Sequence, residues 1–180
     1  MRTLAANSIQ PVSSSTNLNH YNRPANLFDA QSISTLILAG SADGVGVEGT
    51  AEELERWRLA HALSSTSLQR ISDKNTLVLV TEADQFIGLL GTAYSTMSKP
   101  GHFYVGGLYC AVRGQGVGES LLSDQIDYVR KQNGSLAQMT VARDNVAMNH
   151  LATKFGFEIE SEFVDEFFPS GVFRTCLLHL

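Results

Sequence analysis

The stretch that decides the fold reads Val112-Arg113-Gly114-Gln115-Gly116-Val117-Gly118-Glu119-Ser120-Leu121-Leu122. It predicts the end of a strand, a tight turn with three glycines spaced two residues apart, and the first turn of an amphipathic helix. Such a turn exposes consecutive backbone N–H groups where a helix begins, and these groups suit a pyrophosphate. The stretch therefore predicts an anion site at a helix N-terminus.

The glycine spacing excludes two common phosphate loops. No Gly-Lys-Ser/Thr follows, as a P-loop requires. The glycines do not follow G-x-G-x-x-G, and no acidic ribose ligand stands clearly about 20 residues downstream, as a dinucleotide-binding fold requires. The pattern from Arg113 to Gly118 is instead Arg-x-x-Gly-x-Gly.

The composition indicates one ordinary globular domain. With 180 residues, of which 43% are hydrophobic, the chain can bury one full core. Charged residues make up 17%, which argues against a disordered chain or a coiled coil. The net charge of −5 disfavours a general nucleic-acid binder and is compatible with a cationic substrate.

The N-terminus and the cysteines bear on location. Residues 1–16 are rich in Ser, Asn, Thr and Ala and predict a flexible extension ahead of one domain over 17–180. No signal peptide is expected, and no run approaches the roughly 18 apolar residues of a membrane span. Cys110 and Cys176 lie in apolar, strand-like surroundings, so we expect two free thiols and a cytoplasmic protein.

The remaining pattern predicts a mixed sheet with helices on its faces. Residues 40–49 are glycine-rich; they form either a plain flexible connection or, taken alone, a phosphate loop. Asp144/Asn145 is expected to cap the last helix, which ends at Gly156. The expected helices are 26–40, 50–63, 118–132 and 145–156. A short strand is expected to begin at Leu18, and further strands are expected over 76–83, 86–94, 102–110, 136–142, 157–164 and 171–180.

This order and five local motifs resemble the GCN5-related N-acetyltransferases (GNAT) over roughly residues 17–180. Arg23-Pro24-Ala25 with Asp29-Ala30 resembles the opening strand and helix of that family, and 77–91 resembles its central hairpin. The segment 108–122 resembles its CoA strand, loop and helix. Residues 145–157 resemble Asn-x-x-Ala-x-x-Leu-Tyr-x-Lys-x-Gly-Phe.

The resemblance implies an α/β (α+β) fold with a mixed, mostly antiparallel sheet of six to seven strands, flanked by helices and splayed at the acyl-CoA site. Acetyl-CoA is the implied cosubstrate, held in the pantetheine region by Leu108 and the main chain at Gly106 and Gly107. Those two glycines have an alternative role, which is only to relieve packing. The backbone N–H groups implied to hold the pyrophosphate belong to Gly114, Gln115, Gly116, Val117, Gly118 and Glu119.

Two further residues have alternative roles under the resemblance. Arg113, at the Arg/Gln position of the family, either contacts a phosphate or only braces the loop. Asn145 caps its helix and is also expected to face the pantetheine.

The implied reaction is direct attack of a neutral amine on the acetyl-CoA thioester, and the chain departs from the family at the proton donor. Ala152 stands where the family has a tyrosine that protonates the leaving thiolate. The candidate replacements are Tyr104 and Tyr109, whose odd spacing on one strand places them on opposite faces, besides Asn149 and His150. We expect His150 to be a solvated surface histidine.

The candidates for a base are weaker. His102 begins the same strand as the tyrosines, although a histidine at a loop edge is usually incidental. Glu82 ends an earlier strand and is typical of a turn. The three alternating glutamates of 158–162 share one strand face in this reading, either as an acidic lip for an amine or as a solvated face. Cys110 reads as a small core residue, and the histidines and cysteines show no metal-ligand spacing.

The sequence thus predicts an acetyl-CoA-dependent N-acetyltransferase that modifies a primary amine on a small molecule or a protein. Two rivals stand beside it: a catalytically degenerate acyl-CoA-binding or sensory module, and an acyltransferase with another acyl donor or acceptor. No nucleic acid, membrane or metal is expected. A homodimer through the last strands is compatible with the sequence, which does not require one.

Overall fold

The computed structural model describes residues 20–26, 29, 32, 35–36, 77–81, 86–90, 93–95, 99–164 and 171–180. The predicted helices 26–40 and 50–63, the glycine-rich loop 40–49, Glu82 and the extension 1–16 lie wholly or mostly outside these residues. None of the described helices is long and apolar enough to cross a bilayer.

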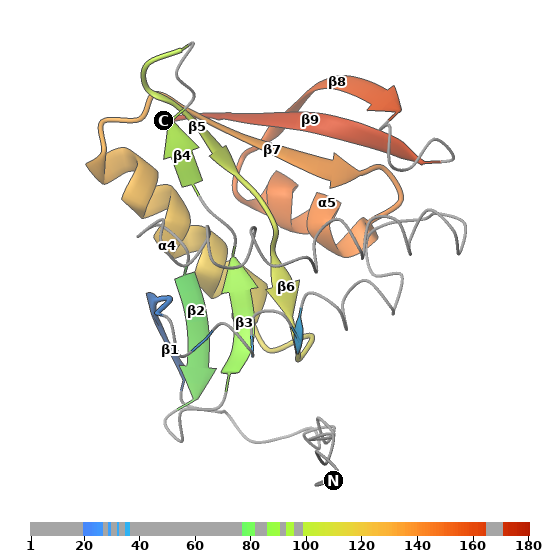
Figure 1. Cartoon of the computed structure of the whole chain (residues 1–180). Helices are drawn as coiled ribbons and strands as arrows, with labels where there is room; N and C mark the ends of the chain where they lie inside the picture. Colours follow the sequence, from blue (N-terminus) through green and yellow to red (C-terminus); the bar gives the residue numbers. More distant parts are fainter. Residues whose placement is uncertain are drawn as a thin grey trace, which may run out of the picture.

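The strands form two sheets, shown in Figure 1. The first is antiparallel throughout and has the order β1-β2-β3-β6. Its strands are β1 (His20–Pro24), β2 (Leu77–Thr81), β3 (Phe86–Leu90) and β6 (Tyr109–Cys110). The second has the order β4-β5-β7-β9-β8, and in it β5 and β7 form the parallel pair. Its strands are β4 (Ala93–Ser95), β5 (His102–Val105), β7 (Leu136–Ala142), β8 (Glu158–Val164) and β9 (Val172–His179).

This architecture confirms the predicted mixed, mostly antiparallel sheet flanked by helices. The prediction of continuous strands over 86–94 and 102–110 was wrong, because each is divided between the two sheets. Nine strand segments are therefore seen in the described ranges, and they correspond to seven longer strands. The division of 102–110 follows from its glycines, since Gly107 has φ +75°, outside the conformation of a strand.

Helix α4 (Val117–Lys131) carries much of the core. Leu121, Leu122 and Val129 are fully buried in one cluster with side chains of β5 and β7 such as Val105 and Met139. These leucines and valines recur at helical spacing, which is why the periodicity predicted the helix to within one residue. Asn133, with φ 58°, and Gly134 then end it. These buried side chains anchor the helix in the core.

Helix α5 (Val146–Lys154) follows β7 directly. The Asn145 side chain caps it by accepting a 3.0 Å hydrogen bond from the Met148 N–H, as the sequence predicted. Gly156, with φ +83°, follows its C-terminus. The C-terminal end of α5 and the start of α4 lie close together, which brings two distant parts of the sequence to one site (Figure 1).

Candidate functional site

The sheet opens where β5 ends and β6 begins. β5 pairs with β7 only from His102 to Tyr104, and β6 pairs with β3 instead. β7 continues to Ala142, and beyond Gln138 its described pairing is with β9 alone. β6 and the second half of β7 therefore diverge and do not pair with each other in the described residues (Figure 1). This is the splay that the sequence led us to expect.

Two glycines lie at this opening, and they have different roles. A Cβ on Gly106 would lie 2.5 Å from Cε1 and 3.2 Å from the hydroxyl oxygen of Tyr104, so this residue must be glycine for the tyrosine ring to pack there. Gly107 instead has a positive φ that turns the chain from one sheet into the other. Relief of packing is thus one role of this pair, and chain reversal at the splay is the other.

The glycine turn presents a bare helix N-terminus. Gly114 and Gly116 have φ +71° and +76°, and a Cβ on either would meet no atom within 4 Å. Gly116 is the N-cap of α4 and supplies no side-chain cap. In the first helical hydrogen bond, the Ser120 N–H donates to the Gly116 carbonyl at 2.9 Å. The N–H groups of Val117, Gly118 and Glu119 precede that bond and have no intrahelical acceptor. They are free to bind an anion.

Gly118 fits the start of α4 against its neighbours. Its Cβ would lie 3.3 Å from Leu108 Cδ2, and 3.6 Å from both Cys110 Sγ and Leu151 Cδ2. The Leu108 side chain therefore packs behind the helix start, while its main chain lies at the splay. Burial raises the pKa of the Cys110 thiol to about 11, although the charge of Arg113 opposes the rise. Cys110 is a packing residue, as predicted, and both cysteines are free.

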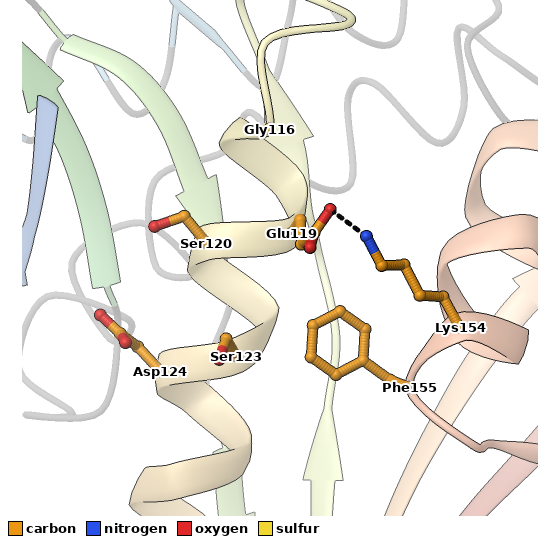
Figure 2. Close-up of a pocket in the computed structure, with 7 residues that line it drawn as sticks. All are labelled: Gly116, Glu119, Ser120, Ser123, Asp124, Lys154 and Phe155. Carbon is orange, nitrogen blue, oxygen red and sulfur yellow. Dashed lines mark ion pairs between the residues drawn. The ribbon is translucent and has the colours of Figure 1, made fainter. Parts of the chain in front are cut away.

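A pocket of about 510 Å³ adjoins the glycine turn, between α4 and the end of α5 (Figure 2). An ion pair forms one edge of it, with 2.6 Å between Lys154 Nζ and Glu119 Oε2. Asp124, which also lines the pocket, accepts a 2.6 Å hydrogen bond from the Asn22 side chain of β1. The lining consists of Gly116, Glu119, Ser120, Ser123, Asp124, Lys154 and Phe155. Sequence reasoning missed Lys154, because only the folded chain brings it to the turn.

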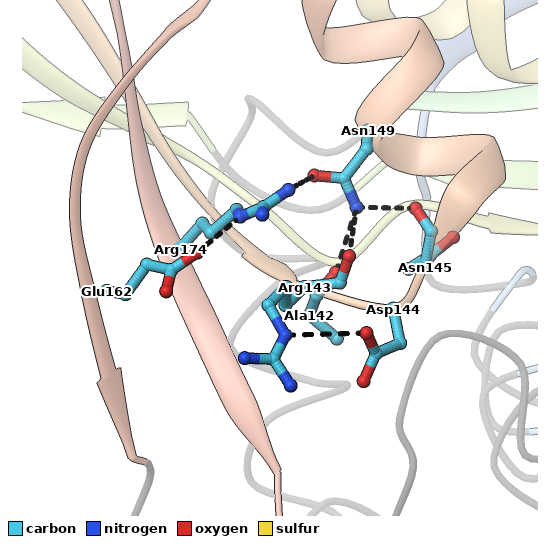
Figure 3. A network of polar contacts seen from close by, with 7 residues as sticks. All are labelled: Ala142, Arg143, Asp144, Asn145, Asn149, Glu162 and Arg174. Carbon is cyan, nitrogen blue, oxygen red and sulfur yellow. Dashed lines mark hydrogen bonds and ion pairs between the residues drawn. The ribbon is translucent and has the colours of Figure 1, made fainter.

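A polar network fixes the loop between β7 and α5 (Figure 3). The Asn149 amide donates to the carbonyl oxygens of Ala142, Arg143 and Asn145 at 2.7–3.0 Å. Its oxygen accepts from Arg174, which also pairs with Glu162 at 2.8 Å. The Asn149 side chain thus uses its amide to hold this loop, which removes it as a replacement for the missing tyrosine.

The proton-handling candidates differ sharply in position. Ala152, at the usual tyrosine position, is 4% exposed and lies in the core, whereas His150 is exposed as expected. Tyr104 places its hydroxyl beside Gly106, at the splay. His102 lies two residues earlier on the same strand face; it is buried, and both ring nitrogens lack a hydrogen-bond partner. Tyr109 lies on β6, beyond the break, so strand alternation does not relate it to Tyr104.

The glutamates of β8 do not share a face, contrary to our expectation. A bulge between Ile159 and Ser161 interrupts the register, so Glu158 lies opposite Leu177 and Glu162 opposite Arg174. These two partners are three residues apart on β9, which places the two glutamates on opposite faces. All three are solvent-exposed, which favours the solvated reading over an acidic lip.

Comparison with known proteins identifies the class. The sequence model of the acetyltransferase (GNAT) domain matches residues 45–169, so the chain belongs to the GNAT acetyltransferase family. As a member of this family, it is an acetyltransferase. No curated protein matches the chain significantly.

Several solved structures share the fold at low identity. The PaiA N-acetyltransferase of Thermoplasma acidophilum in complex with coenzyme A has a TM-score of 0.73 at 15% identity, over 91% of this chain and 100% of that one. The putative acetyltransferase yncA of Salmonella typhimurium with acetyl-CoA has 0.67 at 17%, over 89% and 94%. The NatC complex bound to Gag peptide and CoA has 0.68 at 17%, over 91% and 99%.

Proposed function

We propose that this chain transfers the acetyl group of acetyl-CoA to a primary amine by direct attack, and that it does so in the cytoplasm. One observation carries the proposal: the N–H groups of Val117, Gly118 and Glu119, which have no intrahelical acceptor, start a core-anchored helix beside a splayed sheet edge. Diphosphate oxygens suit those groups, since helix N-termini favour anions. The free thiols are typical of a reducing compartment.

The splay between the strands supports binding of the pantetheine arm of CoA at this site. The edge of β7 beyond Gln138, where its described pairing is with β9 alone, offers backbone groups to the amides of the arm. Asn145 keeps its amide N–H₂ available, because capping uses only its oxygen. The open space over Gly114 and Gly116 leaves room for the phosphates, with Arg113 exposed beside them.

The amine must lose a proton to react. A lysine amine is only about 0.04% neutral at pH 7, while an α-amine is about 10% neutral. A base or a water chain therefore assists. We assign this role to His102, whose unpartnered ring lies on the strand face that carries Tyr104.

The acetyltransferase assignment is tested by thiol release. The protein is mixed with acetyl-CoA or propionyl-CoA and, in turn, with a peptide that has a free α-amine, a lysine peptide, a polyamine, a small aryl amine and an alcohol. We expect turnover with at least one amine. Binding of CoA without turnover on any of them would favour the binding module, and turnover only with propionyl-CoA or an alcohol would favour the other rival. Absence of CoA binding would overturn the proposal.

Tyr104→Phe tests the source of the leaving-group proton. The tyrosine hydroxyl lies beside Gly106 at the splay, so we assign to it the role that Ala152 lacks. We expect kcat to fall about tenfold with the Kd for CoA unchanged. This loss is smaller than the usual effect of removing a general acid, because a leaving thiol of pKa about 8.5 departs readily as the thiolate anion. Tyr109→Phe is the matched control, and an equal loss there would contradict the assignment.

A further inference from the structure

The ion pair between Lys154 and Glu119 joins the two helices at the glycine turn (Figure 2). Glu119 is the third residue of α4, and Lys154 is the last residue of α5. Both side chains are about half exposed, at 47% and 50%. Their ionised groups lie 2.6 Å apart and form one edge of the pocket.

The two charges have opposite effects on an anion at the helix N-terminus. The orphan N–H groups and the Lys154 ammonium attract it, whereas the Glu119 carboxylate repels it from the same turn. Glu119 also neutralises the lysine while the two are paired. An exposed ion pair of this kind contributes little to stability, so an incoming phosphate can break it at small cost.

We propose that Glu119 is a competing anion: it holds Lys154 in the free protein and releases it to a phosphate group of CoA. Pairing with Glu119 therefore lowers the affinity for CoA below the value that an unpaired Lys154 would give. This inference rests on the proposed function, because it concerns the same site. It assigns to Glu119 a negative contribution that the loop pattern alone does not indicate.

Glu119→Gln is expected to lower the Kd for CoA about fivefold, measured by titration calorimetry. The size follows from removing one negative charge from the turn that would hold the diphosphate, a repulsion that water weakens to an effect of a few-fold. Lys154→Met is expected to raise the Kd. The effect of Lys154→Met should be larger in the Glu119→Gln background, because there the lysine is free to meet the phosphate.

Asp127→Asn is the matched control. Asp127 is on the same helix, is also about half exposed and pairs with Arg130 at 3.0 Å, so its substitution removes the same charge from a comparable ion pair. Its Kd for CoA should stay unchanged. Titration with dephospho-CoA then separates the two phosphate sources: a retained effect of Lys154→Met assigns the diphosphate, and a lost effect assigns the 3′-phosphate.

The outcomes distinguish this inference from the proposed function. If wild type binds CoA but Glu119→Gln leaves the Kd unchanged or higher, the competing role is overturned and the acetyltransferase proposal stands. The same holds if Lys154→Met has no effect in the Glu119→Gln background, because the lysine then meets no phosphate. If wild type itself fails to bind CoA, the proposed function falls first.

Discussion

Gly116→Val is expected to raise the Kd for CoA at least 100-fold. The glycine has φ 76° and ψ 1°, and it caps α4 without a side chain. A β-branched residue strongly disfavours this conformation, so the loop must leave it and its N–H groups must turn away from the ligand. Loss of two charge-assisted hydrogen bonds of about 1.5–3 kcal/mol each accounts for 100-fold or more.

Gly156→Val controls for backbone strain. Gly156 also has a left-handed φ, of 83°, but it follows α5, and a Cβ there first meets Leu178 Cδ1 at 3.6 Å. Each substitution is expected to cost about 1–3 kcal/mol of unfolding free energy. Only Gly116→Val should change CoA binding in calorimetry. Wild-type affinity in that variant would show that the glycine turn does not hold the phosphates.

The sequence predicted best those parts that local patterns determine. The bounds of α4 and β7 and the Asn145 cap agree with the structure to within one residue, because apolar periodicity and capping act over a few positions. The Arg-x-x-Gly-x-Gly spacing led to the correct family for the same reason: it describes one turn and one helix start.

Features that depend on distant partners were not predicted. Which sheet each half of 102–110 joins depends on pairing with β3 and β7, and the bulge at Glu160 depends on the pairing of β8 with β9. Neither leaves a periodic signal in its own segment. Lys154 and Glu119 are 35 positions apart in the sequence, so their contact followed only from the packing of two helices.

The proton donor shows the same limit at the candidate site. The sequence showed that Ala152 replaces the tyrosine of the family, because this replacement is visible at a single position of a local motif. It left Tyr104 and Tyr109 equivalent, since alternation assumed one unbroken strand. The left-handed Gly107 separates them, and the packing of Tyr104 over Gly106 distinguishes the one beside the splay.

The buried ion pair of the N-terminal segment is expected to make a large, pH-dependent contribution to stability. Arg23 Nη1 and Nη2 each lie 2.7 Å from a carboxylate oxygen of Asp29, which also accepts the Asn26 N–H at 2.7 Å. The Asp29 side chain is only 8% exposed. Asparagine in its place removes the negative charge that both guanidinium nitrogens and the Asn26 N–H contact, so we expect Asp29→Asn to lower the free energy of unfolding by about 2–4 kcal/mol near pH 7.

The pH dependence of this loss follows from the carboxyl group. Burial raises the pKa of Asp29, but hydrogen bonds from Arg23 and the Asn26 N–H, with the charge of Arg23, outweigh it and hold the pKa below its ordinary value. A carboxyl whose pKa is lower in the folded state stabilises above the unfolded value of about 3.9 and loses that contribution as pH falls through the folded pKa.

Urea unfolding of wild type and Asp29→Asn from pH 7 to pH 3 measures this contribution. The difference in unfolding free energy should stay constant down to about pH 5 and shrink below about pH 4, because protonated Asp29 then resembles asparagine. Asp144→Asn is the matched control: its pair with Arg143 is 3.4 Å long and about half exposed, so its loss should stay below about 1 kcal/mol. A difference between wild type and Asp29→Asn that stays unchanged at pH 3 would show that the carboxylate charge is not what stabilises this segment.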